Sequence, residues 1–168
     1  YLRIGKIEEG IDLLNIALNK SRKNNNWGQD IIIVENLIRA YFDSGDLNNA
    51  KKLINQSIID CKAKNQHNHL NRFHLLLARL HVLSGDYPIS IKYFKQYFEN
   101  HNPSQFDIDM NYLYWAEAEL GMNNIEKAKE ILYEQLYSEK SLSFKNEKPY
   151  KRNQKVLWKL YQIFYEIQ

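Results

Sequence analysis

A glycine-containing turn that recurs every 40 residues constrains the fold of this chain more than any other feature. Gly5-Lys6-Ile7, Gly45-Asp46-Leu47 and Gly85-Asp86-Tyr87 each lie 40 positions from the next. Asn123-Asn124-Ile125 is a looser copy 38 positions further on. Asparagine is the best substitute for glycine where a helix end needs a left-handed backbone. Because self-similarity at a period of about 20–50 residues is typical of repeat proteins, the sequence predicts a stack of repeats.

The segment after each turn has the pattern of a helix with one buried face. Small or apolar residues follow at the spacing i, i+3, i+4, i+7 and i+8. The first position is small in all four copies (Gly10, Ala50, Ser90 and Ala128), as two closely crossing helices require. The larger members of these faces are Leu13, Leu14, Leu18, Leu53, Ile54, Ile58, Phe94, Tyr97, Phe98, Ile131, Leu132 and Leu136.

The segments before the turns are helical by the same test, so each repeat is a helix, a tight turn and a second helix. Asparagine, proline and serine separate one repeat from the next, and a single helix pair cannot bury its apolar face without neighbours. The shared faces of the first helices are Val34, Leu37, Ile38 and Tyr41, then His74, Leu77, Ala78 and His81, then Tyr112, Trp115, Ala116 and Glu119.

The period sets the expected boundaries within a single domain, residues 1–168. We expect a partial repeat at 1–24, full repeats at 27–65, 68–101 and 104–140, and a C-terminal capping helix at 149–167. Pro149 suits the first turn of that last helix. The array opens in mid-repeat and without an initiator Met, which favours a fragment of a longer protein.

The helices of the repeats also share a recurring set of small and aromatic residues. The set comprises Leu37-Ile38, Leu77-Ala78, Tyr41, the Gly-Asp turns, Ala50 and Ser90. In these residues the chain resembles the tetratricopeptide repeat (TPR) family. The resemblance implies an all-α fold, an α-solenoid in which antiparallel helix pairs form a right-handed superhelix. The chain departs from that family in its period, which is about 34 residues there, and in lacking a proline that closes the second helix.

Composition excludes several classes of function. A net charge of +3 gives no electrostatic reason for direct nucleic-acid binding. The apolar run Ile31–Val34 is far shorter than the roughly 20 residues that cross a bilayer, so no membrane partner is expected. The single cysteine, Cys61, cannot form an internal disulfide and fits a reducing compartment, so we expect a cytoplasmic protein.

The sequence contains no catalytic motif that we can identify. Phosphate-binding loops, paired cysteines and zinc-protease helices are all missing from it. His67 and His69 lie in a linker, and His74 and His81 occupy the packed face of a helix, where core histidines are common. We therefore expect a protein that is not an enzyme and has neither a metal nor a cofactor.

In the TPR family the first helix of each pair lines a concave wall and binds the partner. Carried over by position, that wall places Arg39 and Arg79 at the same phase, with Arg72 seven residues before Arg79. Guanidinium groups in register can hold a carboxylate or peptide carbonyls, and Asn36 can pair with a backbone amide. The candidate ligand-binding residues are Glu35, Asn36, Arg39, Phe42, Arg72, Leu75, Leu76, Arg79, Leu113, Tyr114 and Glu117.

A second interpretation of the same arginines is that they are paired internally. Glu35 lies four residues before Arg39, and Glu117 matches Arg79 on the next repeat. Exposed ion pairs of this kind contribute only about 0–1 kcal/mol. Whether Arg39 and Arg79 bind a ligand or an acidic neighbour stays open from the sequence.

The repeat length and the composition rich in Lys, Asn and Ile resemble the peptide-sensing quorum regulators of Gram-positive bacteria. That resemblance implies the ligand-sensing C-terminal part of a transcriptional regulator, which binds a short peptide in its concave groove. The alternative is a scaffold that binds a folded protein, with Tyr93, Tyr97 and Tyr133 as a candidate aromatic patch. A helical-repeat RNA binder is disfavoured by the charge. A homodimer is also left open.

Overall fold

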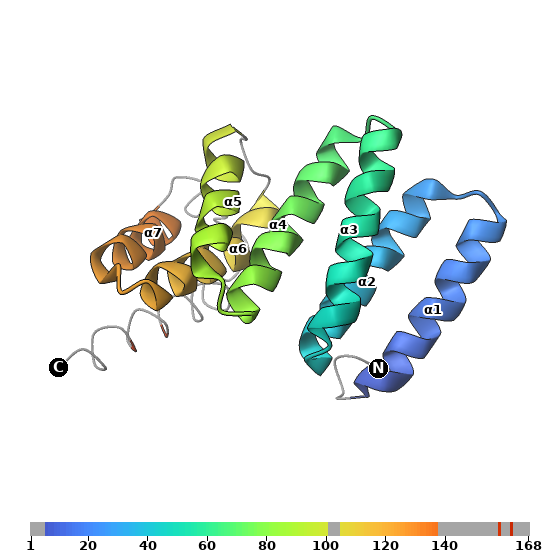
Figure 1. Ribbon diagram of the computed structural model, residues 1–168, viewed down its shortest axis with the longest axis horizontal. Coiled ribbons are helices and arrows are strands. Elements are labelled where there is room, and N and C mark those ends of the chain that lie inside the picture. The colour runs from blue at the N-terminus through green and yellow to red at the C-terminus, as the bar shows by residue number, and fades with distance from the viewer. Residues whose placement is uncertain (1–5, 101–104, 138–157, 159–161, 163–168) are drawn as a thin grey trace, which may run out of the picture. The chain divides into compact units, whose positions relative to one another are not determined.

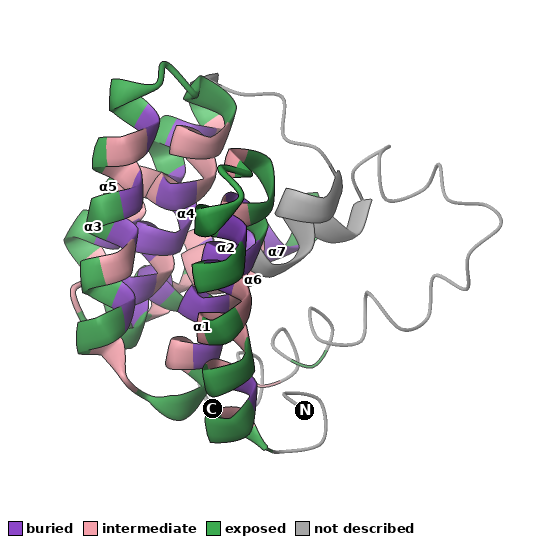
Figure 2. Ribbon diagram, turned by 90° about the vertical axis from the view of Figure 1, so that its right-hand side faces the viewer, coloured by how far each residue is buried: buried purple, intermediate pink, exposed green. Residues whose placement is uncertain are grey.

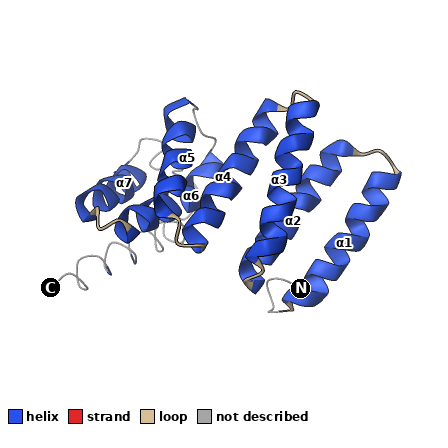
Figure 3. Cartoon of the chain, viewed as in Figure 1, coloured by secondary structure: helices blue, strands red, loops and turns tan. Residues whose placement is uncertain are grey.

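The computed structural model describes residues 6–100, 105–137, 158 and 162, and no strand occurs among them (Figure 3). Consecutive helices joined by short turns confirm the predicted all-α helical-repeat fold. The linker at 102–104 and most of the capping helix expected at 149–167 lie outside the described residues. No helix in the described part of the chain is long and apolar enough to cross a membrane.

The chain divides into two compact units, residues 1–84 and 85–168. The first unit contains α1 (Ile7–Lys23), α2 (Trp27–Ser44), α3 (Leu47–Ala63) and α4 (His67–Leu83). Each of these helices packs against the next in the sequence, and α2 also contacts α4 (Figure 1). The fully buried side chains that fill this unit are Leu37, Ile38, Ala40, Ala50, Ile54, Phe73 and Ala78.

The second unit contains α5 (Tyr87–Asn100), α6 (Gln105–Gly121) and α7 (Ile125–Tyr137). Helix α6 packs against both α5 and α7. Its core with α7 is a cluster of small and aliphatic residues, Ala116, Ala128, Ile131 and Leu132. The boundary between the two units falls at Gly85, inside the repeat that the period places at 68–101.

The predicted turns at Gly45, Gly85 and Asn123 have a left-handed backbone, whereas Gly5 lies outside the described residues. Gly45 and Gly85 have φ values of 76° and 75°, and Asn123, in the looser copy, has φ 60°. The N–H of Asp46 donates to the Tyr41 carbonyl at 2.9 Å and thereby closes the end of α2. The Asp46 side chain then accepts from the N–H of Asn49 at 3.0 Å and starts α3.

The linkers between repeats also contain a residue with a left-handed backbone, which was not predicted from the sequence. Asn25 and Asn65 have φ values of 53° and 54°, and each lies 20 positions from Gly45. The N–H of Asn26 reaches the Ser21 carbonyl at 3.3 Å, and that of Gln66 reaches the Cys61 carbonyl at 2.9 Å. In the first unit the left-handed turn therefore recurs with every helix, at half the period of the full repeat.

The four small positions that follow the turns are buried, as predicted, and Ala50, Ser90 and Ala128 have no exposed surface. Leu13, expected on a buried face, is 49% exposed, so that prediction is wrong. Helix α1 packs chiefly against α2, which leaves much of its surface open to solvent (Figure 2). Ile16, one helical turn after Leu13 on α1, is also 65% exposed to solvent.

Candidate functional site

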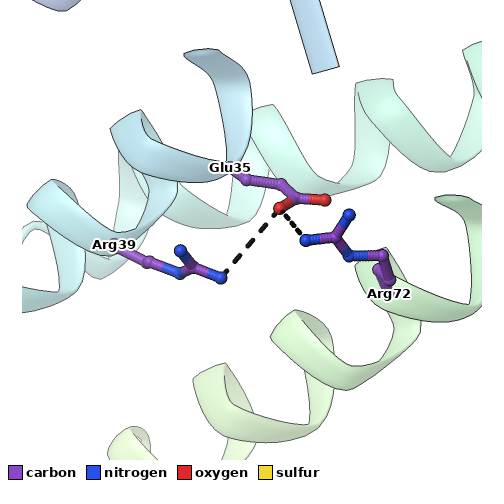
Figure 4. Close-up of polar contacts among 3 residues, drawn as sticks. All are labelled: Glu35, Arg39 and Arg72. Atoms are coloured by element: carbon purple, nitrogen blue, oxygen red, sulfur yellow. Dashed lines mark hydrogen bonds and ion pairs between the residues drawn. The ribbon is translucent and has the colours of Figure 1, made fainter. Parts of the chain in front are cut away.

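Three of the predicted ligand-binding residues form a charged cluster in the first unit. Glu35 and Arg39 lie on α2, and Arg72 lies on α4. The Arg72 Nη2 donates to Glu35 Oε2 at 2.7 Å, and the Arg39 Nη2 lies 4.0 Å from the same oxygen (Figure 4). The cluster thus joins two helices that are the first members of successive pairs.

The three side chains differ in their access to solvent. The Glu35 side chain is 5% exposed, that of Arg72 39% and that of Arg39 51%. A buried carboxylate has lost its hydration and needs charged or hydrogen-bonding partners in its place. Arg72 provides a short charge-assisted bond, so its position is the better fixed of the two arginines.

Arg39 is held much less firmly. A separation of 4.0 Å is too long for a hydrogen bond, and a pair with one partner half exposed contributes little to stability. Internal pairing therefore describes Arg72 well, whereas the Arg39 side chain is half exposed to solvent. Arg79 is half-buried on α4, and its predicted pairing with Glu117 stays a prediction.

Helix α2 exposes further residues beside Arg39. Ile32, Asn36 and Arg39 are spaced so that they share one side of the helix, and we call this side the α2 face. Ile32 is 60% exposed and Asn36 is half-buried, as is Phe42 near the helix end. The α2 face thus combines an apolar side chain, an amide and a cation.

The apolar residues of α4 that were predicted to line the concave wall are too buried to contact a ligand. Leu75 and Leu76 are each 4% exposed, because α4 buries residues on nearly all of its sides. Leu113 packs against the core cluster that α6 shares with α7. Tyr114 is half-buried and Glu117 is exposed, both on α6 in the second unit. Among the predicted site residues, Glu35 on α2 pairs with Arg39 on the same helix and with Arg72 on α4.

Three residues of α3 and α4, namely Cys61, His69 and His74, have pKa values shifted toward their neutral forms. Burial, followed by the charge of Lys62, lowers the pKa of His74, and burial with Arg72 lowers that of His69. Burial, followed by the charge of Asp60, raises the pKa of the Cys61 thiol. No group of three or more His, Cys, Asp or Glu in the described part of the chain is placed to hold a metal ion.

The aromatic patch of the scaffold alternative is only partly exposed. Tyr133 is 40% exposed and Tyr93 is half-buried. Tyr97, at 8%, is buried and meets the ring of Phe98 edge-on, with the centroids 5.4 Å apart. The three tyrosines therefore do not form one open aromatic surface.

The contact between Glu35 and Arg72 was missed in the sequence. The two residues are 37 positions apart, one period minus three, so they lie one helical turn out of phase. The sequence analysis compared successive repeats only at identical phase, so it placed Arg39 level with Arg79 and considered Glu35 and Glu117 as the acidic partners of these two arginines. A search for opposite charges one turn out of phase on successive first helices would have found the pair.

No protein-family model matches the sequence, and no curated protein matches it either. The fold is similar to that of a solved structure, the crystal structure of BtubC (BKLC) from P. vanneervenii, with a TM-score of 0.72. The similarity covers 97% of this chain and 67% of that chain at 15% sequence identity. At that identity the likeness shows the fold alone.

Proposed function

We propose that the chain is a TPR-like module that binds a peptide or protein segment along the α2 face. The observation that carries the proposal is the cluster at Glu35, whose buried carboxylate fixes Arg72 and leaves Arg39 half exposed beside it. A guanidinium in this position can hold a ligand carboxylate by forked hydrogen bonds. The likeness to the TPR family, carried by the repeating turns and small residues, supports the same function.

The other side chains of the α2 face suit an extended peptide. Asn36 has both a donor and an acceptor, which matches the two polar groups of a peptide unit. Ile32 offers an apolar contact on the same side of the helix. A ligand with an acidic group next to an apolar side chain therefore complements the surface in charge and in polarity.

The finer proposal is that the ligand is a short signalling peptide and that the chain is the sensing part of a bacterial regulator in the cytoplasm. Its support is the repeat length and the composition rich in Lys, Asn and Ile. A bound peptide would contact α2 and α4 at once, through Arg39 and Arg72. It would therefore couple two successive helix pairs. In a repeat array each repeat contacts only its neighbours, so a change at this contact can alter the packing of the next repeat.

The test is a selection of random short peptides on the wild-type chain, followed by affinity measurements by fluorescence anisotropy. We expect acidic residues to be enriched among the selected peptides. Arg39→Glu should weaken their binding by about tenfold or more, because a like charge replaces the opposite one. The matched control is Lys52→Glu, which reverses an exposed charge on α3 and should leave the affinity unchanged.

Any of three outcomes would contradict the proposal. If both charge reversals weakened binding equally, the effect would come from net charge and not from the α2 face. If neither did, the site would lie elsewhere on the chain. A hydrophobic consensus without acidic residues would remove the role of the arginines even if binding persisted.

A further inference from the structure

A pocket of about 160 Å³ lies within the first unit and is lined by residues from all four of its helices. It is formed by other residues than the α2 face. Its walls are largely apolar, and its polar groups come from α1, α2 and α3. The lining residues are Arg22, Trp27, Asp30, Ile31, Val34, Leu53, Gln56, Ser57, Asp60 and Phe73.

Two polar atoms of this lining are buried without a hydrogen-bond partner among the described residues. They are the Trp27 Nε1, a donor, and the Asp30 Oδ1, an acceptor. Both belong to the start of α2, three residues apart, so they lie on one side of that helix. Buried polar groups are nearly always paired, and an unpaired donor and an unpaired acceptor that line the same pocket indicate a missing partner.

Other polar groups of the pocket are satisfied by the protein itself. The Ser57 hydroxyl donates to the Leu53 carbonyl at 2.7 Å, and the Gln56 Nε2 donates to Asp60 Oδ1 at 2.8 Å. The ring of Trp27 is held from one face by Lys64, whose Nζ lies 3.6 Å from the ring centroid. The indole therefore has a cation over one face, while its N–H has no partner among the described residues.

The size and charge of the pocket define the class of ligand. A drug-sized ligand needs a pocket of about 300 Å³ or more, so a pocket of about 160 Å³ suits a smaller molecule. The lining contains one cation, Arg22, and two carboxylates, Asp30 and Asp60. A small molecule that carries one negative group, one positive group and an apolar body matches this set.

We propose that the pocket binds a free apolar α-amino acid in its zwitterionic form. Its ammonium group pairs with Asp30 and Asp60, and its carboxylate accepts from the Trp27 N–H and from Arg22. The apolar side chain packs against the walls, which include Ile31, Val34 and Phe73. Binding would satisfy the unpaired donor and the unpaired acceptor with one ligand.

Thermal unfolding of the full chain with millimolar L-leucine, L-valine or L-phenylalanine tests the proposal. We expect at least one of them to raise the unfolding temperature by about 2 °C or more, because a ligand that binds only the folded state stabilises it. For that amino acid, the N-acetyl derivative lacks the ammonium group and the amide derivative lacks the carboxylate. Both should shift the temperature much less.

The outcomes that would overturn the proposal are distinct. No shift with any of the three amino acids would mean that the pocket holds only water. A shift of equal size with the amide would show that Arg22 and Trp27 do not bind a carboxylate. A shift of equal size with the N-acetyl derivative would show that Asp30 and Asp60 do not bind an ammonium group. These comparisons use the wild-type chain and do not depend on how well a variant folds.

A matched pair of variants locates the binding. Asp30→Asn should weaken the amino acid's affinity, measured by calorimetry, by about tenfold or more, because the ammonium group loses a charged partner. Asp43→Asn makes the same change at an exposed position on α2 and should leave the affinity unchanged. Equal affinities for the two variants would place the amino acid outside the pocket.

Discussion

The two units of the chain are stabilised in different ways. In the first, the left-handed turn closes each helix at regular intervals, and the core is mainly aliphatic. In the second, aromatic rings fill the space between α5 and α6. Phe98 stacks on Trp115 with the centroids 5.3 Å apart, and Phe94 stacks on the same ring at 6.4 Å. One 40-residue sequence period therefore produces the same helix pair with two kinds of core.

Among the described residues each unit buries one glutamate, and the difference between the two explains where the candidate site lies. Glu119, at 2% exposed, accepts from the Trp115 Nε1 at 3.2 Å and from the Asn124 Nδ2 at 2.8 Å. It binds the end of α6 to the start of α7. Glu35 instead faces arginines that reach solvent. The Glu119 carboxylate stabilises a turn between helices, whereas the Glu35 carboxylate orients arginines that a ligand can contact.

The largest expected effect tests whether the two cores are independent. Phe94→Ala should destabilise the second unit by about 3–5 kcal/mol, because it removes a fully buried ring that stacks on Trp115. Ile54→Ala should destabilise the first unit by about 2–5 kcal/mol. Hydrogen exchange followed by mass spectrometry should show faster exchange chiefly in the unit that carries the substitution. Equal acceleration in both units after either change would show that they unfold together.

A smaller effect is expected from the close approach at the end of α6. A Cβ at Gly121 would overlap the ring of Tyr87 on α5, so Gly121→Ala should cost about 1–3 kcal/mol through overpacking. A Cβ at Gly28, on α2, meets nothing within 4 Å. Gly28→Ala should be neutral or stabilise the chain by up to about 1 kcal/mol, because alanine is the better helix former.

Urea denaturation of both alanine variants measures the two free energies of unfolding. The second unit then depends on the fit of one ring against one backbone, whereas the first tolerates an added methyl group. If Gly121→Ala were neutral, the Tyr87 ring would have moved aside at little cost. The proposed difference, that the second unit depends on close packing and the first on its left-handed turns, would then be wrong.

The sequence predicted what depends on local backbone and failed where distant side chains meet. Gly45, Gly85 and Asn123 were predicted because a left-handed residue leaves a clear chemical signature. Asn25 and Asn65 have the same conformation, but they lie in asparagine-rich linkers where no single residue stands out. Leu13 is exposed because an apolar face does not reveal whether a neighbour covers it.

The candidate site was predicted in part. Arg39, Arg72 and Glu35 were all among the expected residues, but their contacts depend on how two helices pack, which periodicity does not give. Leu75 and Leu76 were placed on the wall by phase alone, although α4 is apolar on several sides. The pocket lined by Trp27 has no sequence signature, because its lining residues come from four helices.

The smallest expected effect is a dependence of stability on pH that belongs to the first unit. Burial lowers the folded-state pKa of both His74 and His69 from the ordinary value of 6.5. The unfolded chain therefore binds more protons than the folded chain as the pH falls below that value. Stability should fall from neutral pH through this window and level off once the folded-state pKa values have been passed.

His74→Gln separates this effect from the protonation of carboxylates. It should flatten the change in unfolding free energy between about pH 7.5 and about pH 5.5, where an ordinary carboxylate stays ionised. Hydrogen-exchange protection factors, which are corrected for the intrinsic pH dependence of amide exchange, should fall over the same range in α3 and α4 of the wild type and less so in the variant, since His74 and Lys62 lie on these helices. An unchanged slope in the variant would assign the acid sensitivity to other groups. The aliphatic unit would then be no more sensitive to protons than the aromatic one.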